Sequence, residues 1–142
     1  MSNFIRTIAI GDVHGDYRHV QKLLDHLQYT SIQDRLIFVG DYIDRGEDAK
    51  KTLDLMLSLR EENPNTLFLR GNHDQIFLSC IKKDGRFRKE WWLTVGGKET
   101  IDSFGLKPED DLSLINQKYI DFLESLQDIY IDEELKLIFV HA

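Results

Sequence analysis

IRTIAIGDVHG, residues 5–15, is an apolar, β-branched run that stops at a glycine and continues with an aspartate and a histidine. An apolar run that stops at a glycine and continues with polar residues recurs in RLIFVGDYIDRG at residues 35–46 and in TLFLRGNHD at residues 66–74. A run of about four to six apolar residues bounded by glycine is typical of a buried strand. The chain therefore repeats one unit three times, a buried strand followed directly by polar side chains.

Between these runs the apolar residues take the spacing of a helix. The first such set lies at positions i, i+3, i+4 and i+7 of one helical face and comprises Val20, Leu23, Leu24 and Leu27. A second helix is expected around residues 53–57, and a short third helix over residues 75–80. Alternating strands and helices predict an α/β protein with parallel strands and helices packed on the sheet.

The second half of the sequence is less regular. Residues 91–92 and 96–97 break the periodicity, and a long amphipathic helix is expected over residues 115–126. Residues 129–131 and 135–140 then predict a hairpin. Its last strand runs directly into His141, so a fourth strand end carries a polar side chain.

The composition of the chain excludes several classes of protein. The chain has 142 residues, 42% of them apolar, and a formal net charge of −7. This fits a single domain, residues 1–142, and excludes a disordered chain. The apolar runs are too short to cross a membrane, which takes ~20 residues, and the acidic balance argues against a general nucleic-acid binder. The single cysteine, Cys80, cannot form an internal disulfide, which predicts a reducing, cytoplasmic location.

The strand ends bring together side chains that suit a metal. Carboxyl ends of parallel strands meet at one edge of a sheet, where α/β proteins bind ligands. Carboxylates, an amide and imidazoles without a thiolate favour Mn, Fe or Zn. Any one Gly-Asp or Gly-Asn pair is explained by a turn alone, but three in register indicate a site. Its members are Asp12, His14, Asp41, Asn72, His73 and His141.

GDVHG, GDYIDRG and GNHD together resemble the three signature blocks of calcineurin-like metallophosphoesterases. The branch that the sequence resembles most is that of the phosphoprotein phosphatases, including their bacterial Ser/Thr members. Residues 92–93, 96–97 and 100 and the final residues 139–142 resemble later bacterial landmarks. The resemblance implies an α/β sandwich of two mixed β-sheets flanked by helices.

The resemblance also implies a centre of two divalent metal ions, with Mn expected and Fe, Zn or Ni as alternatives. Asp12 and His14 correspond to ligands of the first ion, and Asp41 corresponds to a carboxylate that bridges both ions. Asn72 and His141 correspond to ligands of the second ion.

Three further residues correspond to the catalytic groups of the family. His73 matches the general acid beside the leaving group, and Asp44 matches the residue that orients it. Arg45 matches a clamp on the substrate phosphate, and a guanidinium fork suits phosphate oxygens. Asp74 is left without a role.

These residues predict metal-dependent hydrolysis of a phosphate ester. A Ser/Thr protein phosphatase is the first expectation, and a dinucleoside tetraphosphate hydrolase of the same superfamily is the alternative. Symmetrical diadenosine tetraphosphatases tend to lack an acid at the position of Asp44, which favours the phosphoprotein substrate. A non-catalytic binding module on the same fold is the third possibility, against which the intact set of ligands, acid and clamp argues.

Members of the family continue beyond the block that ends at Ala142, and a further histidine completes the ligands of their second ion. The sequence is therefore expected to be an N-terminal portion with an incomplete second sheet. We expect one metal ion to bind more tightly than the other.

Overall fold

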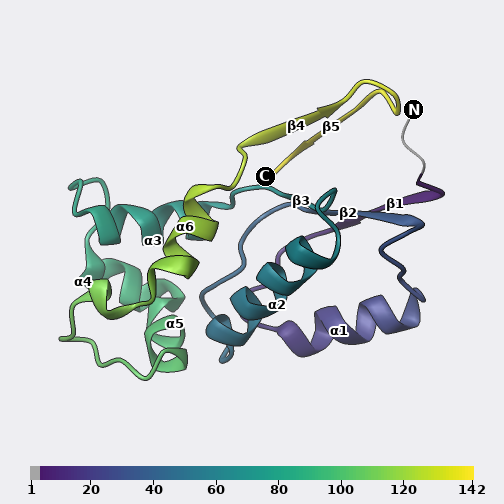
Figure 1. Ribbon diagram of the computed structural model, residues 1–142. Coiled ribbons are helices and arrows are strands. Elements are labelled where there is room, and N and C mark those ends of the chain that lie inside the picture. Colours follow the sequence, from purple (N-terminus) through teal and green to yellow (C-terminus); the bar gives the residue numbers. More distant parts are fainter. Residues whose placement is uncertain (1–3) are drawn as a thin grey trace.

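The computed structural model describes residues 4–142, and its centre is a parallel sheet of three strands. The strands are β1 (Arg6–Ile10), β2 (Asp34–Phe38) and β3 (Leu67–Phe68), arranged in the order β1-β2-β3. Strand β2 is buried along its whole length. The three strands end at the same edge of the sheet, as their sequence pattern predicts (Figure 1).

Two helices connect these strands and cover one face of the sheet (Figure 1). Helix α1 (Tyr17–His26) links β1 to β2, and α2 (Ala49–Glu62) links β2 to β3. Val20 and Leu24 of α1 and Leu53 and Met56 of α2 are buried in the core beneath the sheet. This burial of one stripe on each helix matches the spacing of apolar residues in the sequence.

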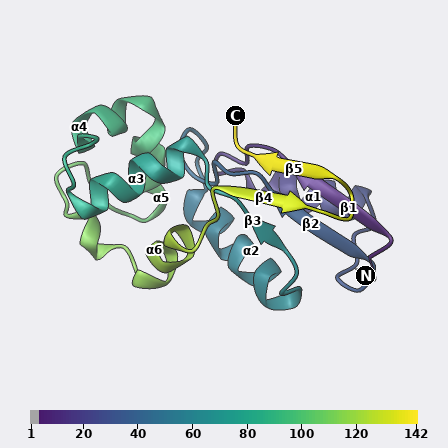
Figure 2. The same cartoon turned by 90° about the horizontal axis from the view of Figure 1, so that it is seen from above.

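A hairpin of β4 (Ile129–Asp132) and β5 (Leu137–Val140) lies on the opposite side of the sheet from α1 and α2 (Figures 1 and 2). It pairs antiparallel, Tyr130 opposite Phe139. In the part of the chain that the structure describes, one sheet is wholly parallel and the other wholly antiparallel, so neither is mixed as expected from the resemblance. The difference follows from the connections: helical crossovers give parallel neighbours, whereas a tight turn gives antiparallel ones.

The remaining helices pack together beside the sheet (Figure 2). Helix α3 (Asn72–Lys82) is followed by α4 (Lys89–Trp92), a kinked turn η1 (Leu93–Gly97) and α5 (Lys98–Ser103). A 3₁₀ turn η2 (Leu112–Leu114) and α6 (Gln117–Glu124) lead to the hairpin.

Two helices differ from their predicted bounds. Helix α3 starts at Asn72 because the Asp74 side chain accepts the Gly71 N–H and caps the first turn. Helix α6 is shorter than expected, because the Asn116 side chain caps it by accepting from Lys118 N and Ile115 is extended. Among residues 4–142 there is no helix with the length and apolar content needed to span a bilayer.

Candidate metal centre

The loops after β1, β2 and β3 lie against one another at the edge where these strands end. The carbonyl of Asp41 accepts the backbone N–H groups of Val13 and His14, at 3.0 and 2.8 Å. Gly40 takes a φ of +115°, and a Cβ there would lie 2.4 Å from the backbone nitrogen of Gly71. Only glycine allows the second and third loops to approach so closely. The glycines of the motifs therefore serve packing between the loops.

Two carboxylates lie between two histidines at the centre of these loops. One oxygen of Asp41, Oδ2, is 3.5 Å from Nε2 of both His14 and His141. Asp12 places Oδ2 3.6 Å from His14 Nε2 and Oδ1 3.8 Å from His141 Nδ1. These separations exceed the 2.7–3.2 Å of an ordinary hydrogen bond. The sequence predicted this gathering at one edge of the sheet; the resemblance assigned Asp12 to the ion of His14, and in the structure Asp12 also lies near His141.

Backbone carbonyls fix the hydrogen on each histidine ring. His14 Nδ1 lies 2.9 Å from the carbonyl oxygen of Ile43, and His141 Nδ1 lies 3.0 Å from that of Val39. A carbonyl only accepts, so each Nδ1 carries a hydrogen, and in the neutral ring each Nε2 then keeps its lone pair. Histidines that ligate metals have this second hydrogen bond, which orients the ring. Both rings thus turn a lone pair toward Asp41.

Asn72 supplies a further oxygen to the same place. Its Oδ1 lies 2.9 Å from Nε2 of His141, which is the nitrogen with the lone pair. With the ring neutral, two acceptors at this distance would repel each other, and a cation that both ligate would remove the repulsion. The donor set of carboxylate, amide and imidazole therefore fits divalent metal ions. Two triads have ligand atoms within 4.8 Å of one another, namely His14, Asp41 and His73, and Asp12, Asp41 and His141.

His73 and Asp44 form a buried pair next to the carboxylates. His73 Nδ1 donates to Asp44 Oδ2 at 2.8 Å, and the two side chains are 5% and 0% exposed. The hydrogen bond to Asp44 raises the pKa of His73 above its usual value, and the charges of Asp44 and Asp41 add to the effect. The structure brings together the two residues that the resemblance paired.

Arg45 joins this pair to the carboxylate cluster. Its Nη2 lies 3.1 Å from Nε2 of His73, and its Nη1 lies 3.3 Å from Nε2 of His14. The guanidinium therefore stands between the two imidazoles. The contact with His14 was not foreseen from the sequence, because Arg45 and His14 belong to different loops.

Two residues from the helical region complete the surroundings of Asp44. Trp92 Nε1 donates to Asp44 Oδ2 at 2.8 Å, and Thr100 Oγ1 donates to Asp44 Oδ1 at 2.6 Å. Sequence reasoning noted both residues as landmarks but gave them no role. The separation of 48 and 56 residues from Asp44 hides these contacts from any local pattern.

Asp74 joins the second loop to the third. Its carboxylate accepts the N–H groups of Gly71, Asp41 and Tyr42 at 2.8–3.1 Å, and it is fully buried. Burial raises the pKa of Asp74 to about 7, although the three N–H donors favour the charged form. This residue holds the backbone that carries Asp41.

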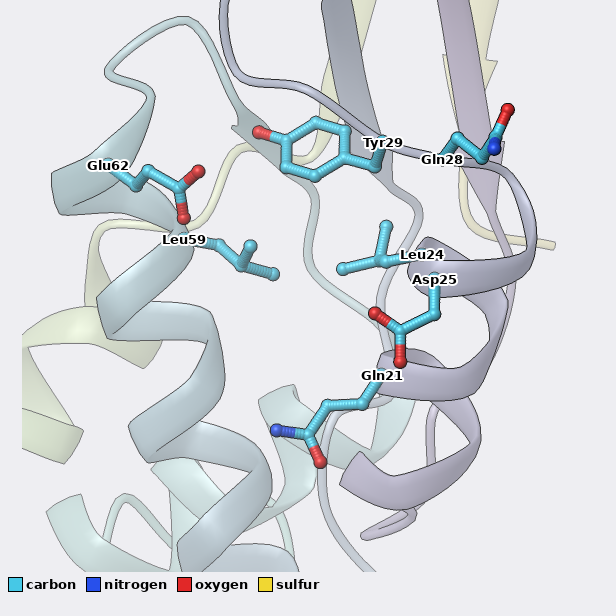
Figure 3. Close-up of a pocket in the computed structure, with 7 residues that line it drawn as sticks. All are labelled: Gln21, Leu24, Asp25, Gln28, Tyr29, Leu59 and Glu62. Carbon is cyan, nitrogen blue, oxygen red and sulfur yellow. The ribbon is translucent and has the colours of Figure 1, made fainter.

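Two cavities differ in their relation to these residues. One of about 350 Å³ borders His14, between the first turn of α1 and the loop of residues 46–48. The other, of about 580 Å³, opens between α1 and α2, where Leu24 and Leu59 line its wall (Figure 3). The second cavity contains none of the predicted site residues, whereas the first is lined in part by His14.

Comparison with known proteins agrees with this geometry. A family model described as calcineurin-like phosphoesterase matches residues 5–141. The chain belongs to this family. A symmetrical bis(5'-nucleosyl)-tetraphosphatase of Proteus mirabilis is 30% identical over 136 residues, which are 96% of this chain and 44% of the relative. The corresponding protein of Coxiella burnetii (strain Dugway 5J108-111) is 43% identical over 72 residues, 51% of this chain and 23% of the relative.

This calcineurin-like phosphoesterase chain spans less than half the length of these curated relatives. Among solved structures, the cold-active protein-tyrosine phosphatase of a psychrophilic Shewanella species matches 91% of this chain and 41% of its own, with a TM-score of 0.60 and 18% identity. An identity so low shows the fold alone. The shared fold confirms the expected architecture of helices and two sheets.

Proposed function

We propose that the chain carries the metal centre of a phosphoester hydrolase that cleaves a dinucleoside tetraphosphate. The observation that carries the hydrolase proposal is Asp41, whose Oδ2 is equidistant from two imidazole lone pairs at 3.5 Å. The names of the Proteus and Coxiella relatives support the choice of substrate. They favour the alternative over the first expectation of a Ser/Thr protein phosphatase. A nucleotide substrate and the single buried Cys80 both fit a cytoplasmic location.

The proposed ligands of two divalent ions, with manganese expected, are Asp12, His14, Asp41, Asn72 and His141. Such ions would neutralise charge on the phosphate and lower the pKa of an attacking water. The chain fixes the direction of the two histidine ligands through the carbonyls of Ile43 and Val39. It fixes Asp41 through Asp74, which accepts the Asp41 N–H at 2.9 Å. Hydrogen bonds within the protein thus orient three of the five proposed ligands, His14, Asp41 and His141.

In the proposed reaction His73 donates a proton to the leaving oxygen. Asp44 accepts from Nδ1, which leaves Nε2 turned toward the guanidinium of Arg45 and the carboxylate cluster. A proton on Nε2 is stabilised by the Asp44 carboxylate and lies on the side where a substrate phosphate would bind. Arg45 offers two N–H groups to the phosphate oxygens once it leaves the imidazoles. Each of these steps uses a side chain whose position is set by a named contact.

One observation keeps the phosphoprotein substrate as the second candidate. Asp44 is present, fully buried and hydrogen-bonded to His73, which meets the expectation for a phosphatase that expels a poor alkoxide leaving group. A non-catalytic binding module would not need this pair.

Three substrates separate the possibilities. The full-length protein, purified and loaded with Mn²⁺, is assayed on diadenosine tetraphosphate, on a phosphoserine peptide and on an aryl phosphate. We expect metal-dependent turnover of all three, with the largest kcat/KM for the dinucleotide. A preference for the phosphopeptide would restore the Ser/Thr phosphatase, and no metal-dependent turnover of any substrate would favour the binding module.

A further inference from the structure

One face of the α4–η1–α5 segment contacts Asp44 and Arg45. Trp92, Gly96 and Thr100 follow each other at intervals of four residues. Trp92 Nε1 donates to the Asp44 carboxylate, and the Gly96 carbonyl accepts the Arg45 N–H at 3.1 Å. A Cβ on Gly96, whose φ is +119°, would lie 2.8 Å from the Arg45 nitrogen. The segment therefore fits closely against the backbone of these two residues.

The hydroxyl of Thr100 makes two hydrogen bonds to the same residue. It accepts the backbone N–H of Asp44 at 2.9 Å and donates to Asp44 Oδ1 at 2.6 Å. The side chain of Thr100 is fully buried, so water cannot replace either bond. One hydroxyl thus links the main chain of Asp44 to its own carboxylate and fixes the rotation of that side chain.

Asp44 needs such support because its backbone is in an unfavourable region. Asp44 has a φ of +69° and Arg45 a φ of +70°, and residues with a Cβ rarely adopt left-handed values in succession. Such conformations persist where surrounding contacts determine them, and they occur often at functional sites. The supporting segment is itself kinked at residues 93–97, where Val95 and Gly96 depart from helical backbone angles.

We infer that Thr100 and Trp92 are positioning residues for proton donation by His73, an inference that rests on the proposed function. Thr100 donates to Oδ1 of Asp44, and Trp92 donates to Oδ2. These two bonds fix the carboxylate in the orientation in which Oδ2 also accepts from His73 Nδ1. The ring of His73 then presents Nε2 to the substrate. Both side chains are fully buried, so they can act on the substrate only through Asp44.

A matched pair of variants isolates the hydroxyl. Thr100→Val keeps the shape of the side chain and removes both hydrogen bonds, whereas Thr100→Ser keeps the hydroxyl. The Mn²⁺-loaded protein is assayed on an alkyl phosphate, which needs a proton donor, and on an aryl phosphate with a good leaving group, which does not. General acid catalysis contributes ~10²–10⁴-fold, and His73→Asn measures that full value.

We expect Thr100→Val to slow hydrolysis of the alkyl phosphate ~10-fold or more, which is less than the loss in His73→Asn. Hydrolysis of the aryl phosphate should slow much less. Thr100→Ser should stay near wild type on both substrates. Trp92→Phe, which keeps an aromatic ring against Phe77, should show the same leaving-group dependence with a smaller loss. Equal losses on the two substrates, or equal behaviour of the serine and valine variants, would overturn the inference.

A measurement without turnover separates this inference from the proposed function. The hydrogen of His73 Nδ1, bonded to a buried carboxylate, should give a low-field proton NMR signal, and His73→Asn assigns it. We expect the signal in wild type and in Thr100→Ser, and its shift or loss in Thr100→Val. Circular dichroism checks that Thr100→Val folds, and if it does not, Trp92→Phe provides the same test. An unchanged signal in the folded variant would contradict the positioning role even in a protein without phosphatase activity.

Discussion

The parallel sheet and the hairpin contribute to the same site but are packed very differently. Four of the five proposed ligands lie at the ends of β1–β3, and only His141 follows the hairpin. Strand β2 is buried along its whole length, with Phe38 fully covered. On the hairpin, the side chains of one face are each about half exposed, namely Ile129, Ile131, Ile138 and Val140.

The hairpin is attached to the parallel sheet by few contacts. Arg35 of β2 pairs with Asp132 and lies 3.3 Å from the hydroxyl of Tyr130. Gln127, just before β4, exchanges backbone hydrogen bonds with Phe68 and Arg70. A two-stranded hairpin is at best marginally stable without packing. The difference implies that ligands on the parallel sheet are held more firmly than His141.

The largest effect should come from Asp41→Asn, which removes a charge near both histidines. Its backbone φ of +56° is one that asparagine tolerates, and the amide oxygen can still accept the His73 N–H. Loss of an outer partner of a metal ligand costs ~10–100-fold, so loss of a shared ligand should cost more than ~10²-fold in kcat/KM. Steady-state assays at saturating Mn²⁺ measure it.

Asp12→Asn serves as the control for Asp41→Asn, since Asp12 is half exposed and also lies near both histidines. We expect a smaller loss in this variant. Equal losses would show that burial of the carboxylate does not matter, and activity near wild type in Asp41→Asn would remove the bridging role.

His141→Ala should weaken the binding of one metal ion and leave the binding of the other unchanged. Wild-type calorimetry with Mn²⁺ should show two unequal sites, because His141 follows the half-exposed hairpin whereas His14 follows a strand of the parallel sheet. In the variant the Mn²⁺ affinity of the weaker site should fall ~10-fold or more, and the affinity of the tighter site should stay the same. His19→Ala, an exposed histidine on α1, is the matched control. Two equally tight sites in the wild type would contradict the comparison between sheet and hairpin.

Much of this arrangement follows from sequence, and the reasons are physical. An apolar run stopped by glycine specifies both a buried strand and the place where a polar side chain emerges, so β1–β3 and the residues at their ends were predicted together. The prediction of a hairpin that ends at His141 is likewise confirmed by pairing of β4 with β5.

Contacts between distant segments could not be predicted from such patterns. Nothing local to Thr100 or Trp92 indicates a bond to Asp44, and nothing local to Asp74 indicates that it accepts three N–H groups from two loops. Buried polar side chains are satisfied by whatever the tertiary fold brings near them. Residues that position others are therefore harder to predict than residues with their own chemistry.

Arg35→Met should loosen mainly the hairpin, with a smaller effect than the loss of a ligand, although Arg35 also donates to Thr7 of β1. It leaves Asp132, which is buried, without its guanidinium, and an unpaired buried charge is costly. The hairpin should loosen, so the weaker metal site should lose ~10-fold or less in affinity, below the loss for a direct ligand. In the double variant Arg35→Met/Asp132→Leu no buried charge remains, so affinity should recover in part. A double variant worse than the single one would show that the ion pair does not attach the hairpin.

The smallest effect concerns a pair within the parallel sheet, Arg6 and Asp34, which join β1 to β2 through two hydrogen bonds of 2.6 and 2.8 Å. The hydrogen bond from Arg6 holds the pKa of Asp34 below its usual value of 3.8. A carboxyl whose pKa is lowered by folding stabilises the native state above its unfolded pKa, and this contribution is lost as pH falls through the folded pKa.

Asp34→Asn should therefore lower Tm at neutral pH, and the gap from wild type should narrow steadily once the pH is below about 3.8. Thermal unfolding followed by circular dichroism across this range checks it, with Asp25→Asn, an exposed carboxyl on α1, as the control. Because the pair does not touch the hairpin, the ratio of the two Mn²⁺ affinities should stay as in wild type. A change in that ratio would mean that the parallel sheet and the hairpin do not hold their ligands independently.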